Sequence, residues 1–174
     1  APAPRGVALS PDGRRLAVGY RGDDGRPGAP TVHDAASGAL LAQLPRPPLA
    51  AGNLATVAFG RDGDTLFAAG SGYRAPGHHP LLLYDLRRAA VRAEAEAAAN
   101  TITDGIVATD GTLLFSTFDG RWGTASPALQ VETGTALLAD MRRPDRLRIS
   151  DDGRRVAVLT RLDAAPQWFD LDRR

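Results

Sequence analysis

The sequence predicts an all-β fold built from about four copies of a small antiparallel sheet. The first observation is an Asp-Gly pair followed by an apolar strand in four segments: SPDGRRLAVGY at 10–20, GRDGDTLFAAG at 60–70, ATDGTLLFST at 108–117 and SDDGRRVAVLT at 150–160. The second observation is the spacing of their glycines, because Gly13, Gly63, Gly111 and Gly153 follow one another after 50, 48 and 42 residues. A period of about 40 to 50 residues is typical of the four-stranded blade of a β-propeller.

Each Asp-Gly pair lies between two short apolar strands. The strand before it reads VAL, VAF, IVA or LRI, and in the strand after it apolar or small residues recur at every second position. This alternation is the period of a strand with one face in the core. Asp-Gly favours a tight hairpin because glycine adopts the positive φ that the turn needs. We expect the turn carboxylates to accept hydrogen bonds from turn amides; they belong to Asp12, Asp62, Asp110 and Asp152.

A third strand that ends in an acidic residue is expected after each hairpin. The segments TVHD, LLYD, LQVE and QWFD end at Asp34, Asp85, Glu132 and Asp170. Together with the Ser-Pro-Asp-Gly turn and the turn at 36–38, they resemble the repeats of WD40 propellers, in which Trp-Asp ends the third strand. The resemblance covers nearly the whole chain, with His33, Tyr84, Val131 and Phe169 in place of tryptophan. TolB-like and lactonase-like propellers share the Ser-Pro-Asp-Gly turn and are the neighbouring alternatives.

One partial propeller domain is predicted over residues 1–174, with blades at approximately 6–46, 54–99, 104–141 and 145–174, the last without a fourth strand. The composition of 89–100 favours a helix, but apolar residues alternate there with charged ones, so we predict an outermost strand. WD40 rings usually have more than four blades, and closure covers strand edges. We therefore expect half of a larger or shared ring, completed by a second copy, another chain or residues outside this sequence.

Composition and charge narrow the classes of function. Of 174 residues, 43% are hydrophobic and 24% charged, which is the usage of a folded domain. The net charge of +1 argues against a nucleic-acid partner. The absence of cysteine excludes disulfides and thiolate metal sites. Neither an apolar run of membrane-spanning length nor a signal-peptide pattern is present, so we expect no membrane partner and a cytoplasmic location, with an extracytoplasmic one as the alternative.

The sequence shows no catalytic constellation, and we predict no catalytic residue, metal or cofactor. His33 lies at the aromatic position of a third strand, where a packed core histidine is expected. His78 and His79 are adjacent, and adjacent residues of an extended segment point to opposite faces instead of sharing a metal ion. The alternative is a propeller enzyme of the lactonase or hydrolase type, for which Asp119 and Asp163 with either of these two histidines at the central channel are the candidates.

The predicted binding surface is formed by the loops between the second and third strands, which propeller geometry gathers on one rim. These loops, at 20–30, 72–80, 118–127 and 160–166, combine arginine with aromatic residues, the types enriched at binding hot spots. The candidate binding residues are Tyr20, Arg21, Tyr73, Arg74, His78, His79, Phe118, Arg121, Trp122 and Arg161. We expect the rim to dock a protein segment, so that the chain is a non-catalytic interaction or assembly scaffold. The resemblance implies the propeller portion of a larger bacterial signalling or multidomain protein.

Overall fold

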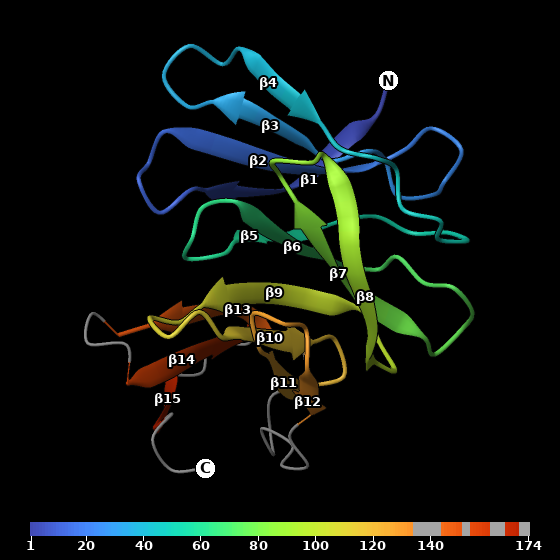
Figure 1. Cartoon of the computed structure of the whole chain (residues 1–174). Helices are drawn as coiled ribbons and strands as arrows, with labels where there is room; N and C mark the ends of the chain where they lie inside the picture. Colours follow the sequence, from blue (N-terminus) through green and yellow to red (C-terminus); the bar gives the residue numbers. More distant parts are fainter. Residues whose placement is uncertain (134–143, 151–153, 161–165, 171–174) are drawn as a thin grey trace.

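The structure is a computed structural model that describes residues 1–133, 144–150, 154–160 and 166–170. These residues form four antiparallel sheets in succession along the chain (Figure 1). The first sheet contains β1 (Ala3–Leu9), β2 (Arg15–Arg21), β3 (Thr31–Asp34) and β4 (Leu40–Gln43). The second contains β5 (Thr56–Phe59), β6 (Thr65–Ala69), β7 (His79–Asp85) and β8 (Ala90–Ala98). The third contains β9 (Ile102–Val107), β10 (Leu113–Thr117), β11 (Trp122–Ala125) and β12 (Val131–Thr133), and the fourth β13 (Pro144–Ile149), β14 (Arg155–Thr160) and β15 (Gln167–Asp170).

The sheets are arranged as consecutive blades of a partial β-propeller. Within each sheet the strands are adjacent in chain order. Between sheets, β1 lies against β5, β5 against β9 and β9 against β13, so that the first strand of every blade forms the inner line of the assembly. The predicted all-β fold class is therefore confirmed, with three strands in the described part of the fourth sheet.

Three apolar clusters fill the spaces between successive sheets. The first lies between the first and second sheets and includes Ala17, Val32, Leu66 and Tyr84. The second lies between the second and third sheets, and the third between the third and fourth. Stacking of sheets through apolar faces buries surface that would otherwise meet water and supplies most of the stability of such a fold. The second sheet consequently has a core on both of its faces.

The segment 89–100 confirms the prediction of an outer strand, because β8 is the fourth and outermost strand of its sheet. Ala93, Ala95 and Ala97 face the second cluster as expected. Val91 does not join them, since the pairing shifts between Leu83 and Tyr84 and places Val91 opposite Tyr84. The extra residue of this β-bulge turns Val91 to the other face of the sheet.

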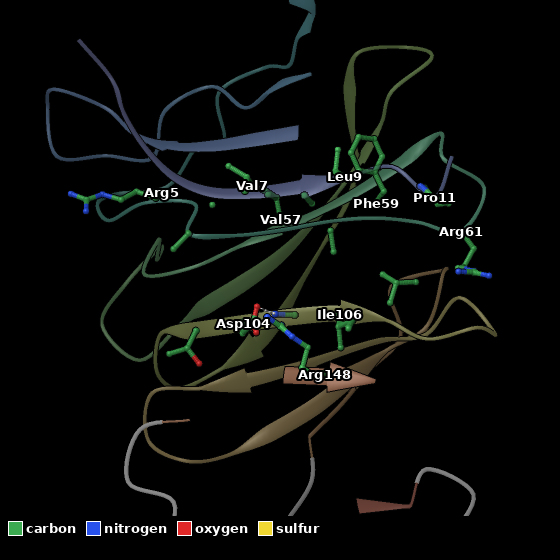
Figure 2. A pocket seen from close by; sticks show the side chains of 17 residues that line it. Arg5, Val7, Leu9, Pro11, Val57, Phe59, Arg61, Asp104, Ile106 and Arg148 are labelled. Atoms are coloured by element: carbon green, nitrogen blue, oxygen red, sulfur yellow. Dashed lines mark hydrogen bonds between the residues drawn. The ribbon is translucent and has the colours of Figure 1, made fainter. Parts of the chain in front are cut away.

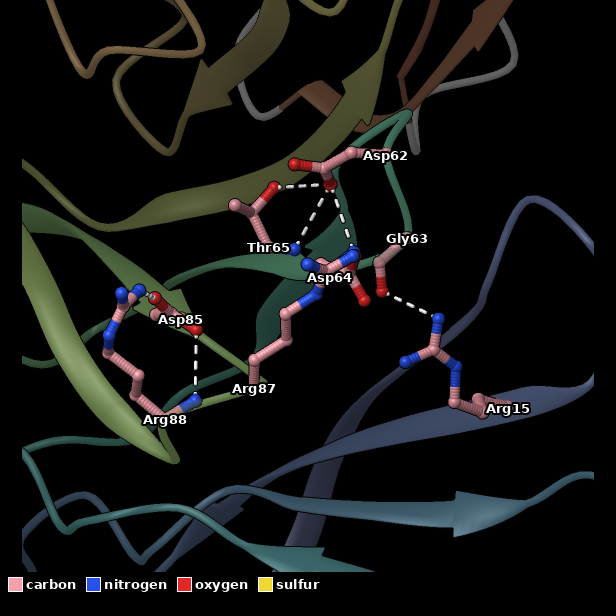
Figure 3. Close-up of polar contacts among 8 residues, drawn as sticks. All are labelled: Arg15, Asp62, Gly63, Asp64, Thr65, Asp85, Arg87 and Arg88. Carbon is pink, nitrogen blue, oxygen red and sulfur yellow. Dashed lines mark hydrogen bonds and ion pairs between the residues drawn. The ribbon is translucent and has the colours of Figure 1, made fainter.

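The Asp-Gly turns form as predicted wherever the structure describes them. Gly13, Gly63 and Gly111 have φ angles of 71°, 70° and 89°, in the region that favours glycine. The Asp62 carboxylate accepts hydrogen bonds from the Asp64 and Thr65 amides at 3.0 and 3.1 Å (Figure 3). Asp12 and Asp110 likewise accept from the amides of Arg14 and Thr112. The turn at Asp152 lies outside the described residues.

The third blade corrects one sequence prediction. The segment LQVE at 129–132 was expected to be a third strand ending at Glu132, but the third strand is β11, Trp122–Ala125, and Glu132 lies in the fourth strand β12. The reason is a tight turn directly after β10, in which the Gly120 amide donates to the Thr117 carbonyl at 3.0 Å. Asp119-Gly120 is thus a hairpin turn instead of part of a long loop.

Within the described part of the chain, the first sheet leaves one apolar face uncovered. Its other face packs on the second sheet through Ala8, Ala17, Val32 and Ala42. On the uncovered face the cross-strand pairs join Val7 to Val18 and Leu9 to Leu16. The side chains of Val7 and Leu9 are 67% and 60% exposed, and Leu40 on β4 is 57% exposed. Contiguous exposed apolar groups of this kind mark surfaces that another protein element covers.

Candidate binding site

The loops between second and third strands lie at one end of the sheets. Figure 1 shows the β2–β3, β6–β7 and β10–β11 connections at one side, opposite the β1–β2, β5–β6 and β9–β10 hairpins. The β4–β5 connection, at 44–55, lies at the same end because β4 runs parallel to β2. We call this end, with its loops and connections, the rim. It therefore contains more chain than the predicted loops alone.

At the first blade, Tyr20 and Arg21 are the last residues of β2. The Tyr20 hydroxyl lies 3.0 Å from Thr31 Oγ1, which in turn lies 2.8 Å from His33 Nε2. His33 is partly buried, and its Nδ1 lies 3.1 Å from the Gly38 carbonyl. Tyr20 is therefore held within its own sheet by this series of polar contacts, whereas Arg21 is exposed.

At the second blade, the predicted loop at 72–80 is shorter than expected, because its last two residues belong to β7. His79 begins β7 and is buried, with 8% exposure, so it is no exposed rim residue. Its ring packs edge-on against Tyr73, with centroids 5.8 Å apart. His78 is exposed, and its Nδ1 lies 3.5 Å from a Glu96 carboxylate oxygen on β8. Arg74 binds Glu94 with both Nε and Nη2, at 2.5 and 2.6 Å.

At the third blade, the exposed rim residues are Phe118, which is 45% exposed, and Arg121. Arg121 Nε lies 3.5 Å from Asp119. Trp122 was predicted to lie in a loop, but it is the first residue of β11. Its side chain is half-buried because it packs against the apolar cluster between the third and fourth sheets. Arg161 lies outside the described residues.

Three arginines that are distant in the sequence meet in a rim cleft of about 460 Å³. It is lined by Arg26, Arg46, Pro47, Pro48, Leu49, Ala50 and Arg74, and we call it the arginine cleft. Only Arg74 was among the predicted binding residues. Arg26 lies in a predicted loop, whereas Arg46 lies in the connection between blades, outside the predicted loops. Its sequence signal is the prolines of PRPPL, which favour an exposed extended segment.

The arginines of this cleft are fixed by neighbouring groups. Arg46 donates from Nε to the Pro27 carbonyl at 2.7 Å and from Nη2 to Asp24 at 2.5 Å. The hydrogen bond from Arg46 lowers the pKa of the Asp24 carboxyl below its ordinary value, with the Arg26 amide adding to the effect. The Glu94 carboxylate raises the pKa of Arg74 in the same way. Both ion pairs therefore persist at neutral pH.

A second concavity, of about 670 Å³, follows the inner strands β1, β5, β9 and β13 (Figure 2). Its lining includes Arg5, Arg61 and Arg148, and of the described residues around it Asp104 is the one carboxylate. Asp104 accepts a hydrogen bond from the Leu147 amide at 2.7 Å and so links β9 to β13. Asp104 therefore stabilises the contact between the third and fourth blades.

Of the candidates for an enzymatic site, the three that the structure describes, His78, His79 and Asp119, do not line this channel. His78 and His79 contact Glu96 and Tyr73, as described above, and neither lines the channel. Asp119 accepts a hydrogen bond from the Thr117 hydroxyl at 2.5 Å within the β10–β11 turn. Asp163 lies outside the described residues. Within the described ranges, no three His, Asp or Glu side chains are grouped as a metal site, and no helix is long and apolar enough to span a membrane.

No family model and no curated protein matches the chain. Among solved structures, the fold is similar to that of hydrazine synthase from Kuenenia stuttgartiensis, with a TM-score of 0.74 and 14% sequence identity. The similarity covers 98% of this chain, which spans 47% of the length of the other. At this identity the similarity shows the fold alone, because one fold carries many unrelated functions.

Proposed function

We propose that the chain is a WD40-like propeller module that binds a segment of another protein on its rim and acts as a non-catalytic scaffold. The observation that supports this most is the composition of the rim, where exposed arginines and Phe118 occupy connections of three successive blades. Arginine and aromatic side chains make strong contacts at protein interfaces because they offer planar donors and broad apolar surface. A cytoplasmic location in a larger bacterial signalling protein is part of the same proposal.

The acids that end the third strands support the WD40-like assignment. Asp34 ends β3 and accepts hydrogen bonds from the amide and hydroxyl of Ser37, at 2.8 and 2.6 Å. Asp85 ends β7 and accepts from the amide of Arg88 at 3.0 Å (Figure 3). Both acids thus stabilise the turn into the fourth strand. Because the same contact recurs in two blades, we assign these acids a structural role. The rim remains the proposed binding surface.

The same proposal includes an assembly step. The uncovered apolar face of the first sheet has the composition of a face that packs on a neighbouring blade, as its opposite face does. We propose that this face packs on a blade of a second copy of the chain and so extends the ring. Trp168 on the last described strand, which is 56% exposed, offers an apolar group at the other end of the series of sheets.

The binding proposal is tested by crosslinking from the rim. A photoreactive phenylalanine analogue at position 118 is expected to form an adduct of defined mass with a protein of the source cell. Replacement of Arg74 and Arg121 by alanine should abolish that adduct. The matched control replaces Arg14 and Arg61, two exposed arginines near the hairpin ends, and should keep it. An adduct that survives the rim variant, or that is lost equally in the control, would show that Arg74 and Arg121 do not form the binding surface.

A further inference from the structure

The arginine cleft is formed by three chain segments that backbone hydrogen bonds hold together. The Gly52 amide donates to the Gly25 carbonyl at 2.9 Å and joins the blade connection to the β2–β3 loop. The Ala50 amide donates to the Tyr73 carbonyl at 2.8 Å and joins the same connection to the β6–β7 loop. The positions of the arginine side chains are therefore set by a shared backbone framework, although the residues come from two different blades.

Within this framework, two of the guanidinium groups are oriented in advance. Arg46 is held by the Pro27 carbonyl and Asp24, and Arg74 by both oxygens of Glu94. Preorganised donors bind more tightly than free ones, because less side-chain entropy is lost on binding. The remaining N–H groups of these two arginines are available to a ligand, since each guanidinium has five N–H donors.

The third guanidinium, of Arg26, brings the number of positive charges at the cleft above the number of carboxylates beside it. Arg26 is exposed, and its side chain makes no hydrogen bond or ion pair within the described part of the chain. Its backbone amide donates to Asp24 at 3.1 Å, which places the residue beside Arg46. Three arginines against the two carboxylates of Asp24 and Glu94 leave an excess of one positive charge in the cleft.

We propose that the arginine cleft binds an acidic side chain of the protein segment docked on the rim, with Arg26 as its main ion-pair partner. The carboxylate accepts N–H donors of Arg26 in a forked geometry and takes further donors from Arg46 or Arg74. Pro47, Pro48 and Leu49 line the same cleft and pack against the apolar part of the segment. This wall favours a peptide over a nucleic acid, whose backbone would need a longer series of cations.

The inference rests on the proposed function, because it names the chemistry of the segment that the rim binds. The test measures the fluorescence anisotropy of a labelled hexaglutamate peptide titrated with the purified chain at low ionic strength. Saturable binding is expected to the native chain and not with hexaglutamine. Arg26→Ala should raise the dissociation constant about fivefold, the effect of one exposed ion pair of about 1 kcal/mol. The control Arg14→Ala removes an exposed arginine at the opposite end of the sheets that does not line the cleft, and should change the dissociation constant less than about twofold.

Two outcomes would overturn the inference. One is equal loss of affinity in Arg26→Ala and Arg14→Ala, which would reveal general attraction to a basic surface. The other is tighter binding of an oligothymidylate of the same number of units, lost in Arg26→Ala, which would assign the cleft to phosphate backbones. If hexaglutamate fails to bind while the crosslink from position 118 still depends on Arg74 and Arg121, the rim remains the binding surface and only the acidic chemistry is wrong.

Discussion

Arg15 of β2 donates from Nη2 to the carbonyl oxygen of Gly63, 2.7 Å away, and so ties the first blade to the hairpin of the second (Figure 3). The same guanidinium carbon lies 5.6 Å from the centre of the Phe59 ring. The two contacts act on neighbouring parts of one hairpin. Arg15 therefore contributes to the packing of blades, and not to the rim, which lies at the opposite end.

Replacing Arg15 by alanine is expected to lower the free energy of unfolding by about 1–2 kcal/mol, since it removes a charged hydrogen bond and a cation–π contact that are partly exposed. Urea unfolding followed by circular dichroism measures the change. Arg14→Ala is the control, because Arg14 is exposed, and its effect should stay within about 0.5 kcal/mol. Equal losses in both variants would mean that the contact with Gly63 adds nothing.

Gly6 on β1 lies close against the backbone of Ala55, the residue that precedes β5. A Cβ atom at Gly6 would stand 2.2 Å from the Ala55 carbonyl oxygen, a backbone atom that cannot turn away. Gly105, on the first strand β9 of the third blade, would bring its Cβ 3.1 Å from the Thr56 side chain. We expect Gly6→Ala to cost at least about 2 kcal/mol of stability and Gly105→Ala about 1 kcal/mol. Thermal unfolding of the two variants side by side tests this, and the reverse order of stability would contradict it.

The Asp34 turn predicts a loss of stability in acid. The hydroxyl and amide of Ser37 lower the pKa of the Asp34 carboxyl below its ordinary value of 3.8. Because the pKa is lower in the folded state, the turn stabilises the fold fully above pH 3.8 and less as the pH falls through the folded pKa. Urea midpoints between about pH 6 and pH 3 should fall less steeply in Asp34→Asn than in the native chain. Ser37→Ala should flatten the curve as well, and parallel curves for all three proteins would refute this assignment.

The uncovered face of the first sheet predicts self-association. Light scattering should give a mass above the 18.3 kDa of one chain. Val7→Asp combined with Leu9→Asp should return the mass to that of one chain, since two charges would be buried at the contact. Val91→Asp, at another partly exposed apolar residue, is the control and should leave the association intact. A native chain that remains at 18.3 kDa would rule out the second copy as the covering element.

The fold was predictable because its signals are local. An Asp-Gly turn between alternating strands specifies a hairpin within a few residues, and regular spacing of such turns specifies repeated sheets. The third blade shows where this approach fails. Asp119-Gly120 is a second turn of the same kind, placed directly after β10. It shortens the loop and moves Glu132 from the third strand to the fourth.

The site was predictable only in part because it depends on contacts between blades. The sequence predicted rim loops with arginine and aromatic residues, and Arg74 and Phe118 are exposed there. Trp122 and His79 were assigned to the loops, but both begin strands and turn toward neighbouring side chains. Arg46 joins Arg26 and Arg74 only through the packing of the blade connection against two loops. No local pattern carries that information.

The buried position of β7 affects how its pairing register with β6 and β8 is set. From His79 to Tyr84 all six residues are buried, because a blade lies on each side. In a strand with one solvent-exposed face, a register shift of one residue exposes apolar side chains to water and therefore lowers stability. This penalty does not act on β7, because both of its faces are buried. We therefore expect its register to be set at its ends, where Ala75 pairs with His78 and Asp85 accepts a hydrogen bond from the Arg88 amide. A substitution that disrupts either end would therefore allow a register shift in which β7 stays buried. Measurements of exposed hydrophobic surface would not detect such a shift.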